Sequence, residues 1–235
     1  MRKIEKLHHR STRKKAELLF IGIPLLIAII VIVVVVVHNN SVRLARASAA
    51  AYNKSGLDYY NKGDLNNAIR DFNQAIQLNP DFAEAYNNRG SAYNAQGNTA
   101  QAISDFNKAI QVNPDYADAY YSRGKVYADG GDLDRAINDY DKAILLKPDY
   151  TEAYNNLGSA YAGKGDLDHA ITNWAKAIQL NPDGAMTYFN LGQAYIYKGE
   201  TDKAVANLNK AIELCGTNSQ VCELAYQKLQ ELGGK

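Results

Sequence analysis

The sequence predicts an all-α solenoid preceded by one transmembrane helix. A 34-residue pattern occurs five times without a gap between residues 49 and 218. Within each copy, small and apolar residues recur at helical spacing in two stretches that are separated by a glycine. An uncharged apolar run covers residues 18–37. Because one helix pair cannot bury its apolar faces alone, the copies are expected to stack into one elongated core.

Each copy predicts two antiparallel helices. Seven positions of the copy never vary: Tyr at positions 4 and 11, Gly at 8 and 15, Ala at 20 and 27, and Ile at 28. Because the Gly at position 8 and the Ala at position 20 have almost no side chain, the two helices of a copy can approach closely. The bulky residue at position 24 then fills the space beside them. The Gly at position 15 is expected to end the first helix. The five copies are residues 49–82, 83–116, 117–150, 151–184 and 185–218.

Most copies close with the sequence Asn-Pro-Asp, as in Asn79-Pro80-Asp81. Here Asn is expected to cap the next helix and Pro to take its first position. Asp then complements the positive N-terminal end of that helix. This segment therefore predicts the start of the following copy.

The invariant positions and their period resemble the tetratricopeptide repeat family over residues 49–218. The resemblance implies a right-handed α-solenoid of five helix hairpins, whose first helices line a concave groove for a protein or an extended peptide. Asn carries both a donor and an acceptor, so a row of Asn suits a peptide backbone; the alternative is that Asn is merely an acceptable solvated residue. The groove candidates are Asn53, Asn87, Asn88, Tyr121, Lys125, Asn155, Asn156, Phe189, Asn190 and Gln193.

Charged residues at two positions of the first helix refine this expectation. Position 2 is Glu84, Asp118 and Glu152 in the middle copies, and these acids would repel a ligand carboxylate. They suggest a ligand with basic side chains. Arg89 and Arg123 at position 7 are expected to cover apolar surface with their stems and to leave their charge in water.

The C-terminal end predicts a cap. The fifth copy has Leu208 at the bulky position and Gly216 in place of Pro. Residues 219–235 read as a capping helix and tail, which shield the end of the solenoid from water. Cys215 and Cys222 flank this junction. They either form a disulfide in an oxidising compartment or remain a pair of buried thiols.

The N-terminal end predicts a membrane anchor. Residues 18–37 span about 30 Å as a helix, which matches the hydrocarbon core of a bilayer. A basic tail, residues 1–17, precedes them, and a linker, residues 38–48, follows. A cleavable signal peptide is the alternative, although its apolar region is usually shorter. The tail has seven Lys and Arg against two Glu, a net charge of +5, whereas only two Arg lie in the linker.

This asymmetry predicts a cytoplasmic N-terminus and extracytoplasmic repeats, in a bacterial or archaeal cell membrane. Residues 49–235 hold 17 Lys and Arg against 23 Asp and Glu, a net charge of −6, which argues against nucleic acid as a ligand. The sequence contains no P-loop, nucleophile elbow or zinc-protease motif. We therefore expect no enzymatic activity, no metal and no cofactor.

The sequence thus predicts a membrane-anchored scaffold that binds a protein or peptide partner in its groove. Two alternatives stay open. The solenoid either self-associates as a structural, homo-oligomeric component of an envelope complex, or faces the cytosol as an organelle receptor.

Overall fold

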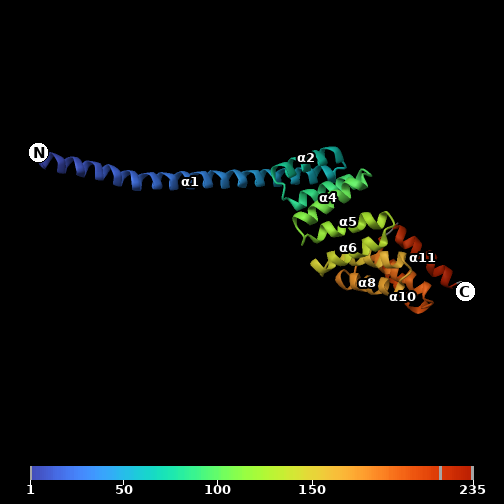
Figure 1. Ribbon diagram of the computed structural model, residues 1–235. Coiled ribbons are helices and arrows are strands. Elements are labelled where there is room, and N and C mark those ends of the chain that lie inside the picture. Colours follow the sequence, from blue (N-terminus) through green and yellow to red (C-terminus); the bar gives the residue numbers. More distant parts are fainter. Residues whose placement is uncertain (1, 217–218, 234–235) are drawn as a thin grey trace.

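The computed structural model describes residues 2–216 and 219–233, with side chains from residue 25 onward. This part consists of eleven helices and no strand, which confirms the predicted all-α solenoid (Figure 1). The bounds are α1 Arg2–Asn61, α2 Leu65–Leu78, α3 Ala83–Ala95, α4 Thr99–Val112, α5 Ala117–Asp129, α6 Leu133–Leu146, α7 Thr151–Gly163, α8 Leu167–Leu180, α9 Ala185–Tyr197, α10 Thr201–Leu214 and α11 Gln220–Gly233.

The helices form five hairpins and a terminal helix. The C-terminal part of α1 pairs with α2, and the later pairs are α3 with α4, α5 with α6, α7 with α8, and α9 with α10. The first helices α1, α3, α5, α7 and α9 also contact one another in succession, whereas the second helices of neighbouring hairpins do not. The first helices are therefore the inner layer of the curve, and the second helices are the outer layer.

Close approach within each hairpin depends on the glycine at position 8. A Cβ atom added to Gly124 would lie 2.9 Å from the Tyr140 ring, and one added to Gly56 would lie 2.5 Å from the Phe72 ring. The same holds for Gly90, Gly158 and Gly192 against Phe106, Trp174 and Leu208. The position 20 alanines are completely buried beside these contacts. Small residues at positions 8 and 20 thus let the bulky position 24 fill the hairpin core.

The glycine at position 15 ends each first helix, as predicted. Gly131 has φ +81°, a left-handed conformation that favours glycine. The N–H of Asp132 then donates to the carbonyl of Tyr127 at 2.9 Å, the bond that closes this type of helix end. The side chain of Asp132 caps α6 by accepting from the N–H of Arg135 at 3.1 Å. Hydrogen bonds from the Arg135 side chain and backbone hold the pKa of Asp132 below its usual value.

The Asn-Pro-Asp segments have a different role from the predicted one. Asn113 and Asn181 are C-caps of α4 and α8 with extended backbone, and their side chains accept from the N–H groups of Asp115 and Asp183. The residue before proline avoids the helical region, so the chain turns here before the next helix begins. That helix starts three residues after the proline, without a side-chain cap. The predictions that this Asn caps the following helix and that Pro takes its first position were both wrong.

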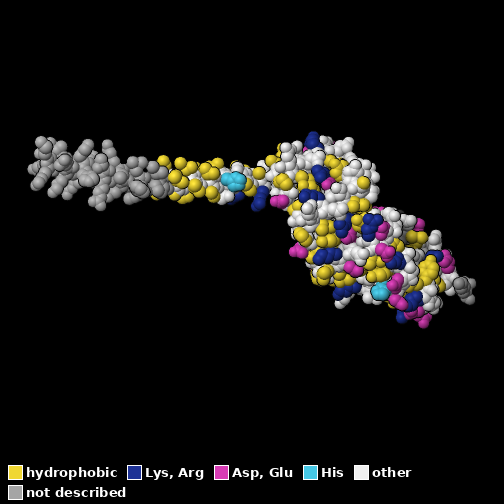
Figure 2. Space-filling view, in the orientation of Figure 1, with side chains coloured by type: hydrophobic (Ala, Val, Ile, Leu, Met, Phe, Trp, Pro, Cys, Tyr) yellow, Lys and Arg dark blue, Asp and Glu magenta, His cyan; other side chains and the backbone are white. Residues whose placement is uncertain are grey.

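The helix α1 runs without a break from the N-terminal region into the first hairpin. Residues 38–48, predicted as a linker, are helical throughout. The segment Leu25–Asn61 contains a window of mean hydropathy 2.5, none of it buried, so it is long and apolar enough to cross a membrane (Figure 2). The predicted basic tail, residues 1–17, and the start of the predicted membrane segment lie outside the described side chains.

The last helix, α11, covers the end of the solenoid. It contacts α9 and α10, and its Ala225 is completely buried against Leu208 and Ala211. Val221, Leu224, Leu229 and Leu232 complete this contact. Cys215, at the end of α10, and Cys222, in the first turn of α11, lie with their sulfurs in bonding contact and their Cα atoms 5.8 Å apart, a separation that a disulfide spans.

Candidate functional site

The predicted groove residues all lie on the inner layer, but burial divides them. Asn53, Asn87 and Phe189 are only 4%, 7% and 5% exposed. Phe189 packs in the core beside Leu208, so its predicted role as a groove contact does not fit its burial. The half-buried candidates are Asn88, Tyr121, Asn155, Asn156, Asn190 and Gln193, and Lys125 is exposed.

Several of the Asn side chains join neighbouring repeats. Asn53 Nδ2 donates to Glu84 Oε1 at 3.1 Å, and Asn53 Oδ1 accepts from Asn88 Nδ2 at 3.0 Å. Between the third and fourth repeats, Asn156 Nδ2 donates to the Tyr121 hydroxyl at 3.2 Å. The position 5 residue therefore contacts the first helix of the next copy. These amides hold the inner layer together, a role that neither interpretation of the Asn row anticipated.

Asn155 has the same role between the fourth and fifth repeats. Its side-chain oxygen accepts from the Thr187 hydroxyl at 3.1 Å, and its backbone carbonyl accepts from Trp174 Nε1 at 3.1 Å. Asn155 thus connects α7 to both α8 and α9. Its hydrogen bonds are made within the protein.

Three of the predicted residues that are not buried keep their polar atoms free. In the described part of the chain, the side chains of Lys125, Asn190 and Gln193 make no hydrogen bond and no ion pair with another residue. Asn190 and Gln193 both lie on α9, and Lys125 lies on α5 with its ammonium 5.8 Å from the centre of the Tyr121 ring. These groups are available to a ligand in the groove.

A pocket of about 250 Å³ opens between α7, α8 and α9. Its apolar walls include Leu167 and Trp174, and the indole N–H of Trp174 is already bonded to Asn155. Asn190 and Gln193 line it as well, together with Ser159, Ala162, Ala194 and Tyr197. This hollow combines apolar side chains with two free amides.

An acidic and aromatic row follows the starts of the first helices. Glu84, Asp118 and Glu152 lie in the first turns of α3, α5 and α7, where they also complement the helix dipoles. In the described part of the chain none of them forms an ion pair with Lys or Arg. Burial, and then the nearby charges of Asp118 and Glu84, raises the pKa of Tyr116. Burial and Asp118 likewise raise the pKa of Tyr150.

Arg89 and Arg123 form ion pairs that the sequence interpretation missed. Arg123 donates to both carboxylate oxygens of Asp139 at 2.8 and 2.7 Å, and to Asn107 Oδ1 in the preceding repeat at 2.5 Å. Its hydrogen bonds to Asp139 raise the pKa of the guanidinium. Arg89 binds Asp105 in the same way. The prediction that these charges lie in water was wrong, because the paired aspartates are buried.

The repeats themselves contain the signal that identifies this pair. Position 23 is Asp where position 7 is Arg, and it is Asn where position 7 is Leu, as in Leu157 with Asn173. Asn173 needs no arginine because it donates to the His169 carbonyl of its own helix at 2.9 Å. In the first copy Ser55 takes the arginine's place and donates to Asp71 at 2.6 Å.

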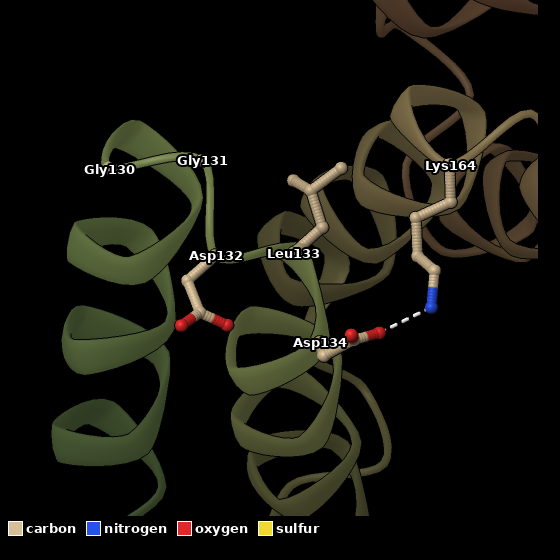
Figure 3. Close-up of a pocket in the computed structure, with 6 residues that line it drawn as sticks. All are labelled: Gly130, Gly131, Asp132, Leu133, Asp134 and Lys164. Carbon is tan, nitrogen blue, oxygen red and sulfur yellow. Dashed lines mark hydrogen bonds and ion pairs between the residues drawn. The ribbon is translucent and has the colours of Figure 1, made fainter.

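A second hollow, of about 500 Å³, lies at the turn between α5 and α6 (Figure 3). Asp132 caps α6 here, and Asp134 pairs with Lys164 of the next repeat. Lys198 and Asp168 repeat this pairing one copy further on. The charged groups of this hollow therefore connect adjacent turns, and their role is structural.

Sequence models of two repeat families match most of the chain. One, described as "TPR repeat", matches residues 56–97, 90–129 and 124–165, and the other, "Tetratricopeptide repeat", matches residues 149–216. The chain belongs to the tetratricopeptide repeat (TPR) family. No curated protein matches the chain in sequence.

Solved structures show the same fold. The crystal structure of MamA is 30% identical, with a TM-score of 0.62, and the match covers 71% of this chain and 91% of MamA. YrrB, described as "a TPR protein with an unusual peptide-binding site", is 24% identical, with a TM-score of 0.63 and coverage of 82% and 97%. Pseudomonas aeruginosa pilF is 18% identical, with a TM-score of 0.73 and coverage of 81% and 87%. The last two similarities concern the fold alone.

The Arg123–Asp139 pair yields a stability prediction. Arg123→Leu lowers the free energy of unfolding by about 3 kcal/mol, because a buried carboxylate loses its partner. Arg123→Leu combined with Asp139→Asn recreates the Leu157 and Asn173 combination and returns to within about 1 kcal/mol of the wild type. Urea unfolding followed by circular dichroism measures both. Equal stability of the single variant and the wild type would contradict the role of this pair.

Proposed function

We propose that this TPR protein is a membrane-anchored scaffold that binds a protein partner, through an extended segment, in its concave groove. The observation that carries the proposal is the set of free polar side chains at and near a partly apolar pocket on the inner layer. Lys125, Asn190 and Gln193 have no partner in the described part of the chain, and Asn190 and Gln193 line the pocket. An extended peptide presents unpaired backbone donors and acceptors, which amide side chains satisfy.

The fold is compatible with this role. YrrB, whose printed description includes a peptide-binding site, shares the solenoid architecture. The inner layer of the present chain is also rigidly built, since Asn53, Asn88, Asn155 and Asn156 bond across its repeats. A pre-organised surface loses less conformational entropy when it binds a ligand.

The anchor in this proposal is the apolar part of α1. Its exposed segment and the net charge of +5 before it support an uncleaved span with a cytoplasmic N-terminus. The repeats then lie on the extracytoplasmic side of a bacterial or archaeal membrane. A disulfide between Cys215 and Cys222 is consistent with that oxidising location and would tie the cap to the last repeat. Tethering concentrates the bound partner at the bilayer.

Partner capture from gently solubilised native membranes tests the groove. A variant with Lys125→Ala, Asn190→Ala and Gln193→Ala is expected to retain a specific partner about tenfold less than the wild type, since it lacks three polar contacts. The matched control carries Lys142→Ala, Asn138→Ala and Gln101→Ala on the outer layer, and it is expected to capture normally. The ammonium of Lys142 lies 5.9 Å from the Tyr120 ring centre, much as Lys125 lies over Tyr121.

Equal capture by both variants would contradict groove binding. If the only protein captured is another copy of this chain, the result would favour the structural, self-associating role instead. Circular dichroism of each variant shows that the solenoid is still folded.

Site-directed labelling tests the topology. In a Cys215→Ser and Cys222→Ser background, a single cysteine replaces the exposed Ser104 on α4. A membrane-impermeant maleimide is expected to label it on intact cells, because the repeats face outward. A cysteine in place of Ser11, in the tail, is the matched control and should react only after the cells are opened. The reverse pattern would support a receptor that faces the cytosol.

A further inference from the structure

Two chemically different features share the groove face of α7. Glu152 lies in the first turn of α7, and Ser159 of the pocket follows seven residues later. Seven residues make almost two complete turns, so both side chains leave the same face of the helix. At about 1.5 Å per residue, they are separated by about 10 Å along the helix axis.

The pocket suits one large apolar side chain. Its volume of about 250 Å³ is a single-side-chain space, and Trp174 offers only apolar contact there because its N–H is already bonded. Tyr197, which also lines the pocket, is 80% exposed. An aromatic side chain of a ligand that entered the pocket would cover the exposed surface of Tyr197 and remove it from water. The free amides of Asn190 and Gln193 line the same pocket and can bond the backbone beside such a group.

The start of α7 suits a cation. Asp118 and Glu152 lie near Tyr150, whose pKa their charges help to raise. Lys147 lies 4.2 Å from the centre of the Tyr150 ring but pairs with neither carboxylate in the described part of the chain. The acidic row therefore keeps negative charge that the solenoid itself leaves unpaired.

A buried acceptor without a donor lies elsewhere on the inner layer, on α3. Asn87 is only 7% exposed, and its Oδ1 atom has no hydrogen-bond donor among the described residues. It lies on α3 one turn from Glu84, the first acid of the row. The equivalent oxygen of Asn53 accepts from Asn88 on the next first helix, whereas the residue at the corresponding repeat position after Asn87 is the shorter Ser122. Near the start of α3 the described chain therefore leaves one acceptor without a donor.

We infer that the groove recognises an extended segment with a bulky apolar residue in the Trp174 pocket and a Lys or Arg on the acidic row. This inference rests on the proposed groove function and specifies its ligand class. A separation of about 10 Å corresponds to about three residues of extended chain. The recognised segment therefore has its basic residue about three positions from its apolar residue.

Selection from a random peptide library displayed on phage tests the pattern, with the full chain held in lipid nanodiscs. The enriched peptides are expected to share a large apolar residue and a Lys or Arg about three positions apart. One synthetic peptide with this pattern is then measured by fluorescence anisotropy. Its own Lys→Glu and apolar→Ala substitutions should each weaken binding about tenfold.

Two protein variants, Ser159→Phe and Glu152→Gln, locate the contacts, and a third, Ser91→Phe, is their control. Ser159→Phe fills the pocket and should weaken the peptide about tenfold. Ser91→Phe, at the same repeat position, should change binding less than twofold; Ser91 and Ser159 each donate to the carbonyl four residues before them. Glu152→Gln should weaken binding about fivefold.

The outcomes separate the two levels of the proposal. If no peptide is enriched over empty nanodiscs, the groove function itself fails. A different result overturns only the ligand class: peptides are enriched and are lost with the Lys125, Asn190 and Gln193 variant, but they lack the apolar and basic pair. Unchanged binding of the peptide to Ser159→Phe would overturn the ligand class in the same way.

Discussion

The contact between the glycine at position 8 and the bulky side chain at position 24 is the constraint on which the solenoid depends. Where Gly124 meets the Tyr140 ring, no space remains for even one added carbon atom. Since the same contact occurs in all five hairpins, the hairpins are alike and stack in register. The first helices then form a continuous inner layer. The groove, its pocket and its acidic row are consequences of that stacking.

The sequence predicts what each repeat does within itself. The glycines and alanines of the hairpin core fall where helical spacing requires small residues, and the cap helix follows from its apolar stripe. These features depend on residues within about one repeat of each other. A period reveals them because it places equivalent residues in equivalent surroundings.

The repeat pattern does not predict which side chains contact one another across helices or between repeats. Arg123 was expected to face water, yet Asp139 lies opposite it and Asn107 lies beside it in the previous repeat. Asn53 was expected to face a ligand, yet Glu84 and Asn88 bind it. Helical spacing gives the direction of a side chain but not its partner across an interface. Covariation of positions 7 and 23 among the copies supplies that information for the arginines.

The unbroken α1 joins the apolar N-terminal segment directly to the first repeat. A flexible linker would let the solenoid turn freely, but residues 38–48 continue the helix into the first repeat. The apolar segment and the first groove helix are thus one element, as Figure 1 shows. In the proposed function, this continuity holds the groove at a defined orientation above the bilayer.

The most direct test of this account compares two substitutions in the third repeat by urea unfolding. Gly124→Ala is expected to lower the free energy of unfolding by about 1–3 kcal/mol, because its Cβ overlaps the Tyr140 ring. Gly130→Ala is the control: its Cβ has ordinary contacts, with the nearest atom at 3.4 Å, and helix propensity alone should leave the protein equally or more stable. If Gly124→Ala also leaves stability unchanged or raises it, the position 8 contact does not determine the packing of the hairpins.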